Sequence, residues 1–285
     1  MIRIEFFYRI DYDKEKDDRS DILARKTMAG IEIDAIQLGG ALGLMVLAIA
    51  LSTWQKLGLE GSLAIATGRS ILQLLVVGYL LEAVFAFRNP FLVLAVVAVM
   101  LTIATVVARN RISKKIPHLL PIVGGSLLLS TALTVGYVNL LVLRPDPWYE
   151  PQNLIPLAGI LLGNTMNAAA IAGDRFVSTL NGSQLEIETH LSLGATPQQA
   201  TTQYRRDAIK TGLIPTINTM LVVGVVTLPG IFTGQVLGGA SPLVAAGYQI
   251  LILFMVAIGT LVTTILVVGG IDRQFFKGVG QWVRY

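Results

Sequence analysis

Long apolar runs separated by short polar segments dominate the chain. The longest run, from Thr211 to Ile271, contains no Asp, Glu, Lys or Arg over 61 residues. One crossing of a bilayer needs roughly 20 apolar residues, so this run is long enough for more than one. The predicted fold class is an all-α integral membrane protein. Its apolar runs predict about seven transmembrane helices, at 35–54, 64–87, 90–108, 119–143, 151–173, 212–230 and 243–270.

The basic residues between the predicted spans indicate the orientation. Placing the C-terminus inside gives inner segments with twelve Lys and Arg residues, whereas the outer loops contain only Arg88 and Arg144. Cytoplasmic loops carry the excess of basic residues in membrane proteins. We therefore expect the C-terminus inside and, with seven spans, the N-terminus outside. The inner segments in this arrangement are 55–63, 109–116, 174–210 and 272–285.

Residues 1–32 are predicted to form a polar N-terminal tail, ahead of a single transmembrane domain over 33–285. The part before Met28 carries seven basic and seven acidic side chains and has no apolar stretch of the kind found in a signal peptide. Met28 is an alternative start, in which case 1–27 is an upstream extension.

Composition restricts the chemistry. The absence of cysteine excludes disulfides, zinc knuckles, iron–sulfur clusters and thiol nucleophiles. His118 and His190 are far apart, so no histidine-based metal site is expected, and any metal ligands are unknown. The net charge of +4 is of the size that span topology produces, so no nucleic-acid partner is expected. The spans contain no Ser/His set, Asp pair or HExxH motif, so no catalytic residues are predicted.

The segment 174–210 is too long to be a simple connection between two spans. Its pattern predicts a helix, a break at Gly194 and a second helix, with Thr196 as N-cap and Pro197 at the first helical position. Such a surface helix either docks into a groove of a soluble partner or lies against its own bundle. An apolar cluster surrounds the break: Leu191, Leu193 and Ala195.

The string ETHLSLGATPQQA, with a later LIP, resembles the cytoplasmic coupling-loop signature of ABC-transporter permeases. The matching positions are Glu188, Gly194, Ala195 and Pro215, and the interval from Gly194 to Pro215 is several residues longer than in importers. The resemblance implies that this loop couples the chain to an ATPase. The implied coupling residues are Glu188, Leu191, Leu193, Gly194, Ala195, Thr196, Pro197, Arg205 and Arg206.

Three longer stretches are similar to FetB-type permeases, a bacterial family tied to iron export whose plant relatives are aluminium-sensitivity and aluminium-rhizotoxicity membrane proteins. They are GNTMNAAAIAGDRF (163–176), HLSLGATPQQA (190–200) and LPGIFTGQVLGGASPLVAAGYQI (228–250).

This resemblance implies a multi-pass permease of the cell inner (plasma) membrane that exports iron, another metal or a small polar solute. It further implies a symmetric homodimer and a separate ABC ATP-binding subunit on 174–210. The phosphate-binding motif GxxxxGK[ST] is absent, so ATP and Mg²⁺ are expected on that partner and no cofactor is expected on this chain. Transport of a nucleotide sugar is an alternative, because the family includes it.

Polar side chains within the spans are candidates for the substrate pathway, because such groups are costly in a bilayer and tend to face the bundle interior. Snorkelling of long side chains to the interface and hydrogen bonds between helices account for the same residues equally simply. The candidates are Arg69, Gln73, Glu82, Asn164, Met166, Asn167 and Asn218.

An ion-gradient-driven secondary transporter is the competing function. Such proteins contain inverted repeats with broken helices at corresponding places. The stretch 228–242, rich in glycine and proline, is either a tight outer turn or a re-entrant segment. It has no counterpart in the first half of the chain, which favours the permease interpretation.

Overall fold

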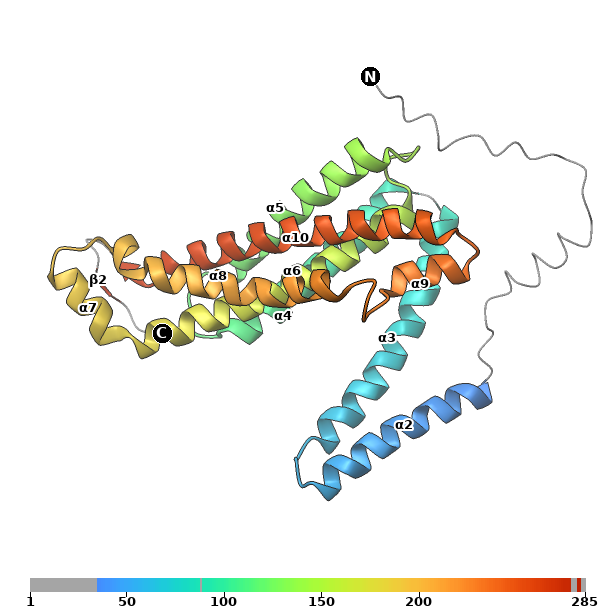
Figure 1. Ribbon diagram of the computed structural model, residues 1–285, viewed down its shortest axis with the longest axis horizontal. Helices are drawn as coiled ribbons and strands as arrows, with labels where there is room; N and C mark the ends of the chain where they lie inside the picture. The colour runs from blue at the N-terminus through green and yellow to red at the C-terminus, as the bar shows by residue number, and fades with distance from the viewer. Residues whose placement is uncertain (1–34, 88, 278–280, 283–285) are drawn as a thin grey trace, which may run out of the picture. The chain divides into compact units, whose positions relative to one another are not determined.

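The computed structural model describes residues 35–87, 89–277 and 281–282, and the predicted tail 1–32 lies outside them. Most of the described residues are helical (Figure 1). The described chain also contains an antiparallel pair of two-residue strands, β1 (Phe276–Lys277) and β2 (Gln281–Trp282). The helices are α2 (Ala35–Trp54), α3 (Glu60–Phe87), α4 (Pro90–Ile112), α5 (Leu119–Tyr137), the π-helix η1 (Val138–Leu143), α6 (Pro151–Gly182), α7 (Gln184–Ser192), α8 (Pro197–Val222), α9 (Gly230–Leu237) and α10 (Pro242–Asp272).

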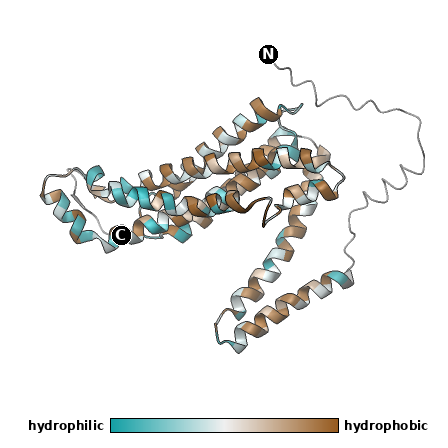
Figure 2. Cartoon of the chain, viewed as in Figure 1, coloured by the Kyte–Doolittle hydropathy of each residue, from teal (hydrophilic) through white to brown (hydrophobic). Residues whose placement is uncertain are grey.

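The all-helical membrane fold predicted from the sequence is confirmed. Among the described residues, six helices are long and apolar enough to cross a bilayer, which is close to the expected seven. Their apolar middles stand out when the chain is coloured by hydropathy, whereas α7 and the first turns of α8 are polar (Figure 2). The six are Gln37–Trp54, Glu60–Phe87, Pro90–Ile112, Leu119–Leu143, Pro151–Gly182 and Pro242–Asp272.

The predicted span at 212–230 is not a helix of its own. It begins inside α8, which runs without a break from the polar segment at Pro197 to Val222. The residues that follow, 223–229, are not helical, and Gly224 has a positive φ of 80°. Pro215 lies inside the helix without ending it. The expected stretch 228–242 contains the short helix α9, which makes it longer than a tight turn.

Proline starts four of the long helices, at Pro90, Pro151, Pro197 and Pro242. A proline in the first helical turn costs no hydrogen bond, because the N–H groups there have no partner within the helix. At α4 the Asn89 side chain also accepts a hydrogen bond from the Phe91 N–H at 2.9 Å. These local signals place the helix starts with little help from tertiary packing.

The described chain divides into two compact units, each considered by itself. The first consists of residues up to Arg69 together with Gly230–Ala246. In it, α2 and the start of α3 are joined by a turn in which Gly58 has a positive φ of 70°. The Ser52 hydroxyl donates to the Glu60 carboxylate at 3.0 Å across this turn. Most of the apolar side chains of α2 are exposed, as expected for a surface that faces lipid.

The second unit, Ser70–Pro229 with the chain from Gly247 onward, contains the hydrophobic core. Helix α6 packs against both α4 and α8, and the Ser130 hydroxyl of α5 donates to the Gly259 carbonyl of α10 at 2.8 Å. The core extends into the polar end of the unit. Its large, fully buried side chains there include Phe176, Leu180, Ile187 and Phe275.

Small residues allow α6 and α8 to approach closely. A Cβ atom added at Gly212 would lie 2.8 Å from the Ala172 Cβ and 2.9 Å from the Ala168 carbonyl oxygen. Both distances are too short, and neither the backbone nor an alanine can rotate away. Close helix packing at small residues is typical of membrane bundles.

Gly212→Ala is therefore expected to destabilise the protein by about 1–3 kcal/mol through overpacking. The matched control is Gly125→Ala on α5, where the new Cβ would meet nothing within 4 Å. The thermal unfolding midpoints of both variants in detergent provide the measurement. A Gly212→Ala protein as stable as the control would contradict the close contact between α6 and α8.

Candidate functional site

The predicted break between two helices is present at the junction of α7 and α8. Helix α7 ends in a Schellman motif: the Ala195 N–H donates to the His190 carbonyl at 3.0 Å, and the Gly194 N–H donates to the Leu191 carbonyl at 3.0 Å. Gly194 has a φ of 93°, which glycine adopts without strain. The break therefore has a defined backbone conformation.

Helix α8 begins immediately after this motif with a capping box. The Thr196 side chain accepts from the Gln199 N–H at 3.3 Å, and the Gln199 side chain accepts from the Thr196 N–H at 2.8 Å. The predicted N-cap at Thr196 and the first helical position at Pro197 are both confirmed. Because both helix ends are capped, the four-residue link between them, 193–196, has few alternative conformations.

One face of α7 belongs to the protein core. Ile187 is fully buried, and Leu191 packs against the same cluster together with Tyr204 of α8. Burial raises the pKa of the Tyr204 hydroxyl above its ordinary value, and the Glu186 carboxylate adds to the rise. Helix α7 is thus anchored to the bundle along one side.

The opposite side of the junction presents apolar surface to solvent. Leu193 is 81% exposed, although it stands in a polar segment directly before Gly194. Glu188, Gly194 and Thr196 are exposed as well. The Glu188 carboxylate accepts a hydrogen bond from the Gln184 side chain at 2.7 Å. A large apolar side chain held out from a rigid polar junction has the form of an anchor for a partner's pocket.

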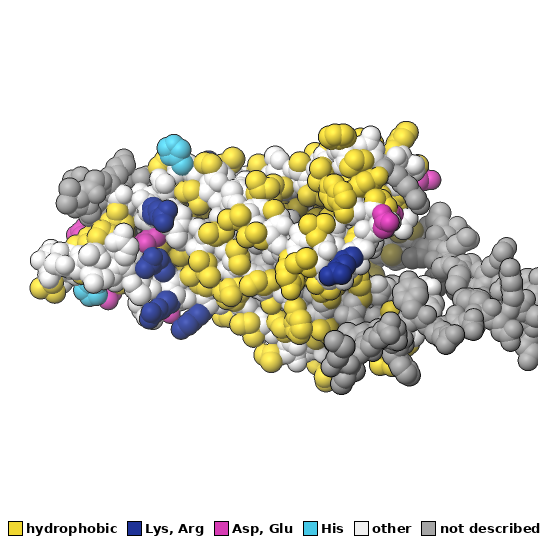
Figure 3. Space-filling model, turned by 90° about the horizontal axis from the view of Figure 1, so that it is seen from above, with side chains coloured by type: hydrophobic (Ala, Val, Ile, Leu, Met, Phe, Trp, Pro, Cys, Tyr) yellow, Lys and Arg dark blue, Asp and Glu magenta, His cyan; other side chains and the backbone are white. Residues whose placement is uncertain are grey.

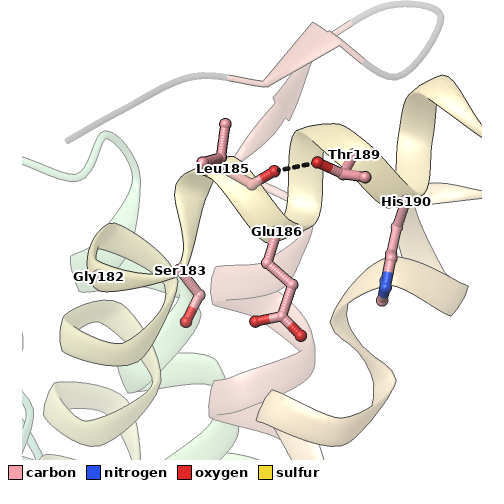
Figure 4. A pocket seen from close by; sticks show the side chains of 6 residues that line it. All are labelled: Gly182, Ser183, Leu185, Glu186, Thr189 and His190. Carbon is pink, nitrogen blue, oxygen red and sulfur yellow. Dashed lines mark hydrogen bonds between the residues drawn. The ribbon is translucent and has the colours of Figure 1, made fainter.

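An open groove of about 430 Å³ lies along α7 beside the end of α6 (Figure 4). It is lined by Gly182, Ser183, Leu185, Glu186, Thr189 and His190. Glu186 and His190 project from the same side of the helix, four residues apart. The groove could not be predicted from the sequence, because its lining residues belong to the end of one helix and to the next helix.

Arg205, one of the predicted coupling residues, makes an ion pair within the chain. Its guanidinium lies 3.5 Å from the Asp272 carboxylate at the end of α10, and Asp272 has a side chain only 7% exposed. The Arg205 guanidinium also donates a hydrogen bond to the Gln198 carbonyl oxygen at 3.3 Å. Arg205 thus holds α8 to α10 behind the junction, whereas Arg206 is exposed. Basic side chains gather on the surface at this end of the molecule (Figure 3).

Arg205→Ala is expected to lower the stability of the protein by about 1–3 kcal/mol, since it leaves the buried Asp272 carboxylate without its ion pair. The double variant Arg205→Ala/Asp272→Asn should recover most of the loss, because no unpaired charge remains. Thermal unfolding of the single and double variants forms a double-mutant cycle. Arg206→Ala is the control and should change stability by less than about 0.5 kcal/mol. The cycle also needs Asp272→Asn alone, and a loss in the double variant equal to the sum of the two single losses would show that the pair contributes nothing.

The predicted pathway residues lie on α3, α6 and α8, and all of them except Met166 are exposed. Arg69, Gln73 and Glu82 are exposed along α3. On α6, Asn164 and Asn167 are exposed, whereas Met166 packs partly against the core. Asn164 donates to the Ile160 carbonyl of its own helix at 2.8 Å, and Asn167 accepts from the Arg111 guanidinium of α4 at 2.9 Å. Asn218 is exposed on α8, and the described structure shows no hydrogen bond from it to either asparagine of α6.

A family model described as "Uncharacterised protein family (UPF0014)" matches residues 35–276, which is nearly all of the described chain. The chain belongs to the UPF0014 family. It is 52% identical to "UPF0014 membrane protein slr1647" of Synechocystis. The match covers 87% of this chain and 95% of the relative. No solved structure matches the chain.

Two further UPF0014 relatives have names that refer to a biological role. "Probable iron export permease protein FetB" of Escherichia coli is 34% identical over 85% of this chain and 92% of its own length. "Protein ALUMINUM SENSITIVE 3" of Arabidopsis thaliana is 34% identical over 81% of this chain and 83% of its own length. The resemblance to this family inferred from the sequence is confirmed.

In the structure, Arg111 belongs to a helix and not to a loop between spans. Arg111 was counted among the basic residues of an inner segment, but it lies in the last turn of α4 and pairs with Asn167. This contact supports the interpretation of Asn167 as a residue that joins helices. Within the described structure, Asn164 makes its hydrogen bond to its own helix, so it stays a predicted pathway residue.

Proposed function

We propose that this UPF0014 chain is the membrane-spanning permease subunit of an ABC-type transporter. In this proposal the chain has no enzymatic activity, and a separate ABC ATP-binding subunit hydrolyses ATP. The subunit docks at the junction of α7 and α8, and two copies of the chain form the pathway in the bacterial inner membrane. The cargo is iron, another metal ion or a small polar solute, which leaves the cell.

The exposure of Leu193 is the observation that carries the proposal. A leucine that remains 81% exposed on a doubly capped junction contributes little packing to the folded chain by itself. Burying such a side chain in a partner's groove contributes about 1.5–3 kcal/mol. The continuous helix α8 then connects the docking junction directly to the apolar part of the bundle.

Relatedness supports the same assignment. The relative from Escherichia coli named an iron export permease aligns over most of both chains, so the likeness is not confined to one motif. A permease that lacks a nucleotide site needs an external source of energy. The capped junction is the part of the described chain with the form of a docking element.

The test is co-expression of the full chain with an ABC ATP-binding protein from the same genome, with an affinity tag on only one of them. Co-purification and ATPase activity in lipid vesicles are the expected results, and stimulation by Fe²⁺ would identify iron as cargo. A catalytically inactive ATP-binding protein is the control for background hydrolysis. Failure to co-purify, together with transport that follows a proton or sodium gradient, would replace this proposal by the secondary-transporter alternative.

A further inference from the structure

A second cavity lies within the apolar part of the bundle, away from the α7–α8 junction. It has a volume of about 290 Å³ and is enclosed by α4, α5, η1 and the start of α6. Its lining is almost entirely apolar. The residues that form most of the wall include Leu94, Leu101, Val135, Leu140, Trp148 and Leu154.

Two buried polar atoms on this wall lack hydrogen-bond partners. They are the Thr131 hydroxyl and the Asn139 carbonyl oxygen Oδ1, on side chains of residues that are 7% and 2% exposed. The Asn139 amide nitrogen donates to the Trp148 carbonyl, which orients the side chain. Oδ1 can only accept a hydrogen bond. Buried polar groups nearly always have partners, so a ligand that donates a hydrogen bond would complete this site.

The backbone around Asn139 is also unusual. Asn139 lies in η1, the six-residue π-helix that continues α5. π-Helices are rare, and they occur frequently at functional sites, because the wider turn displaces side chains from their α-helical positions. The π-helix thus contains Asn139, the residue whose Oδ1 lacks a hydrogen-bond partner.

The side chains at the rim of the cavity are apolar and exposed on the surface of the protein. Leu94, Leu128 and Leu140 all line the cavity and are exposed, and they belong to two of the helices that are able to span a bilayer. Trp148 lines the cavity at the end nearest Asn139 and forms an edge-to-face pair with Tyr149, with ring centroids 5.6 Å apart. Trp and Tyr are enriched at the interface between membrane and water. The opening therefore faces lipid, with its polar end toward the interface.

We propose that this cavity binds one acyl chain of a bilayer lipid, with a hydroxyl or ammonium donor of the same lipid on Asn139 Oδ1. The volume of about 290 Å³ lies just below the range of about 300–1,000 Å³ that holds whole ligands, so it suits part of a lipid, one chain rather than two. Phosphatidylethanolamine and phosphatidylglycerol carry such a donor in the head group, and phosphatidylcholine does not. The site is independent of the ATPase docking proposed above.

The first test fills the cavity from its outer side. Ala132 lines the cavity and is exposed, so Ala132→Trp places an indole in it without disturbing the buried core. Leu133→Trp is the matched control, since Leu133 is the next residue on α5, is exposed and does not line the cavity. The full-length proteins are reconstituted with a phosphatidylethanolamine whose acyl chain bears a photoreactive diazirine, and labelling of 94–158 is measured by mass spectrometry. We expect at least fivefold less labelling in Ala132→Trp and no change in Leu133→Trp.

The second test leaves the protein unchanged and varies the lipid. Vesicles contain equal parts of phosphatidylethanolamine, phosphatidylglycerol and phosphatidylcholine, and native mass spectrometry records which lipid stays bound after extraction. A preference of severalfold for the two lipids with donors is expected. Equal retention of all three would overturn the assignment of Asn139, and equal labelling of wild type and Ala132→Trp would overturn the site itself. Loss of a dimer in Ala132→Trp with unchanged labelling would show that a second copy of the chain covers the opening instead.

Discussion

Replacing Leu193 by alanine is expected to weaken binding of the ATP-binding subunit by about tenfold to a hundredfold. The side chain is 81% exposed in the isolated chain, and its burial in a partner's pocket would contribute about 1.5–3 kcal/mol, with each 1.4 kcal/mol equal to a factor of ten. A few well-packed residues near the centre of an interface carry most of its binding energy. The measurement is the concentration of ATP-binding subunit that gives half-maximal ATPase activity in vesicles.

Leu57→Ala is the matched control for this experiment. Leu57 is also an exposed leucine in a segment predicted to be cytoplasmic, between α2 and α3, but it is far in sequence from the junction. Its replacement should leave ATPase stimulation unchanged. Equal effects of the two substitutions, or none from Leu193→Ala, would contradict docking at the junction.

Gly194→Trp is expected to abolish coupling while leaving insertion into the membrane intact. A Cβ at this position would meet nothing within 4 Å, so the indole has room in the isolated chain and would project where the partner approaches. The φ of 93° adds strain of about 1–2 kcal/mol for a residue with a side chain, confined to the cap of α7. Expression, thermal unfolding and ATPase stimulation are measured together.

Gly194→Asn separates the effect of bulk from the effect of backbone strain. Asparagine tolerates left-handed conformations better than other residues with side chains, so this variant should keep most of the coupling. A second control, Gly182→Ala, lies on the same polar segment at a glycine without a positive φ. Normal ATPase stimulation by Gly194→Trp would show that the partner does not approach this face.

The helix limits could be predicted wherever the signal is local. The expected spans 35–54 and 119–143 coincide with the observed helical segments, counting η1 as part of the second. Prediction was poorer where polarity was taken to mark a helix end. The span expected to end at residue 173 continues to Gly182, although Asp174 and Arg175 follow directly. Backbone hydrogen bonding continues a helix regardless of whether its side chains lie in lipid or water.

In the candidate site too, features set by neighbouring residues could be predicted, whereas contacts made by tertiary packing could not. The cap at Thr196 was predictable, because a threonine, a proline and a glutamine within four residues determine it. The pair between Arg111 and Asn167 was not predictable, because it joins residues 56 positions apart through the packing of α4 on α6. Likewise, only the tertiary fold brings Arg205 to Asp272 and uses it to join two helices. The coupling and pathway roles of the remaining residues stay predictions.

Because α8 is unbroken, the number of residues between its two ends determines how far the side chains at one end are rotated about the helix axis relative to those at the other. Its 26 residues rise about 39 Å at 1.5 Å per residue, and each residue advances the helix by about 100°. The proposed docking face at Thr196 and the apolar face beyond Thr211 therefore have a fixed angle of rotation relative to each other. A single residue added between Lys210 and Thr211 would turn one face by more than a quarter of a circle relative to the other, whereas seven added residues would nearly restore the setting. Homologous chains of this design can thus vary in length at that point only in steps of whole helical turns.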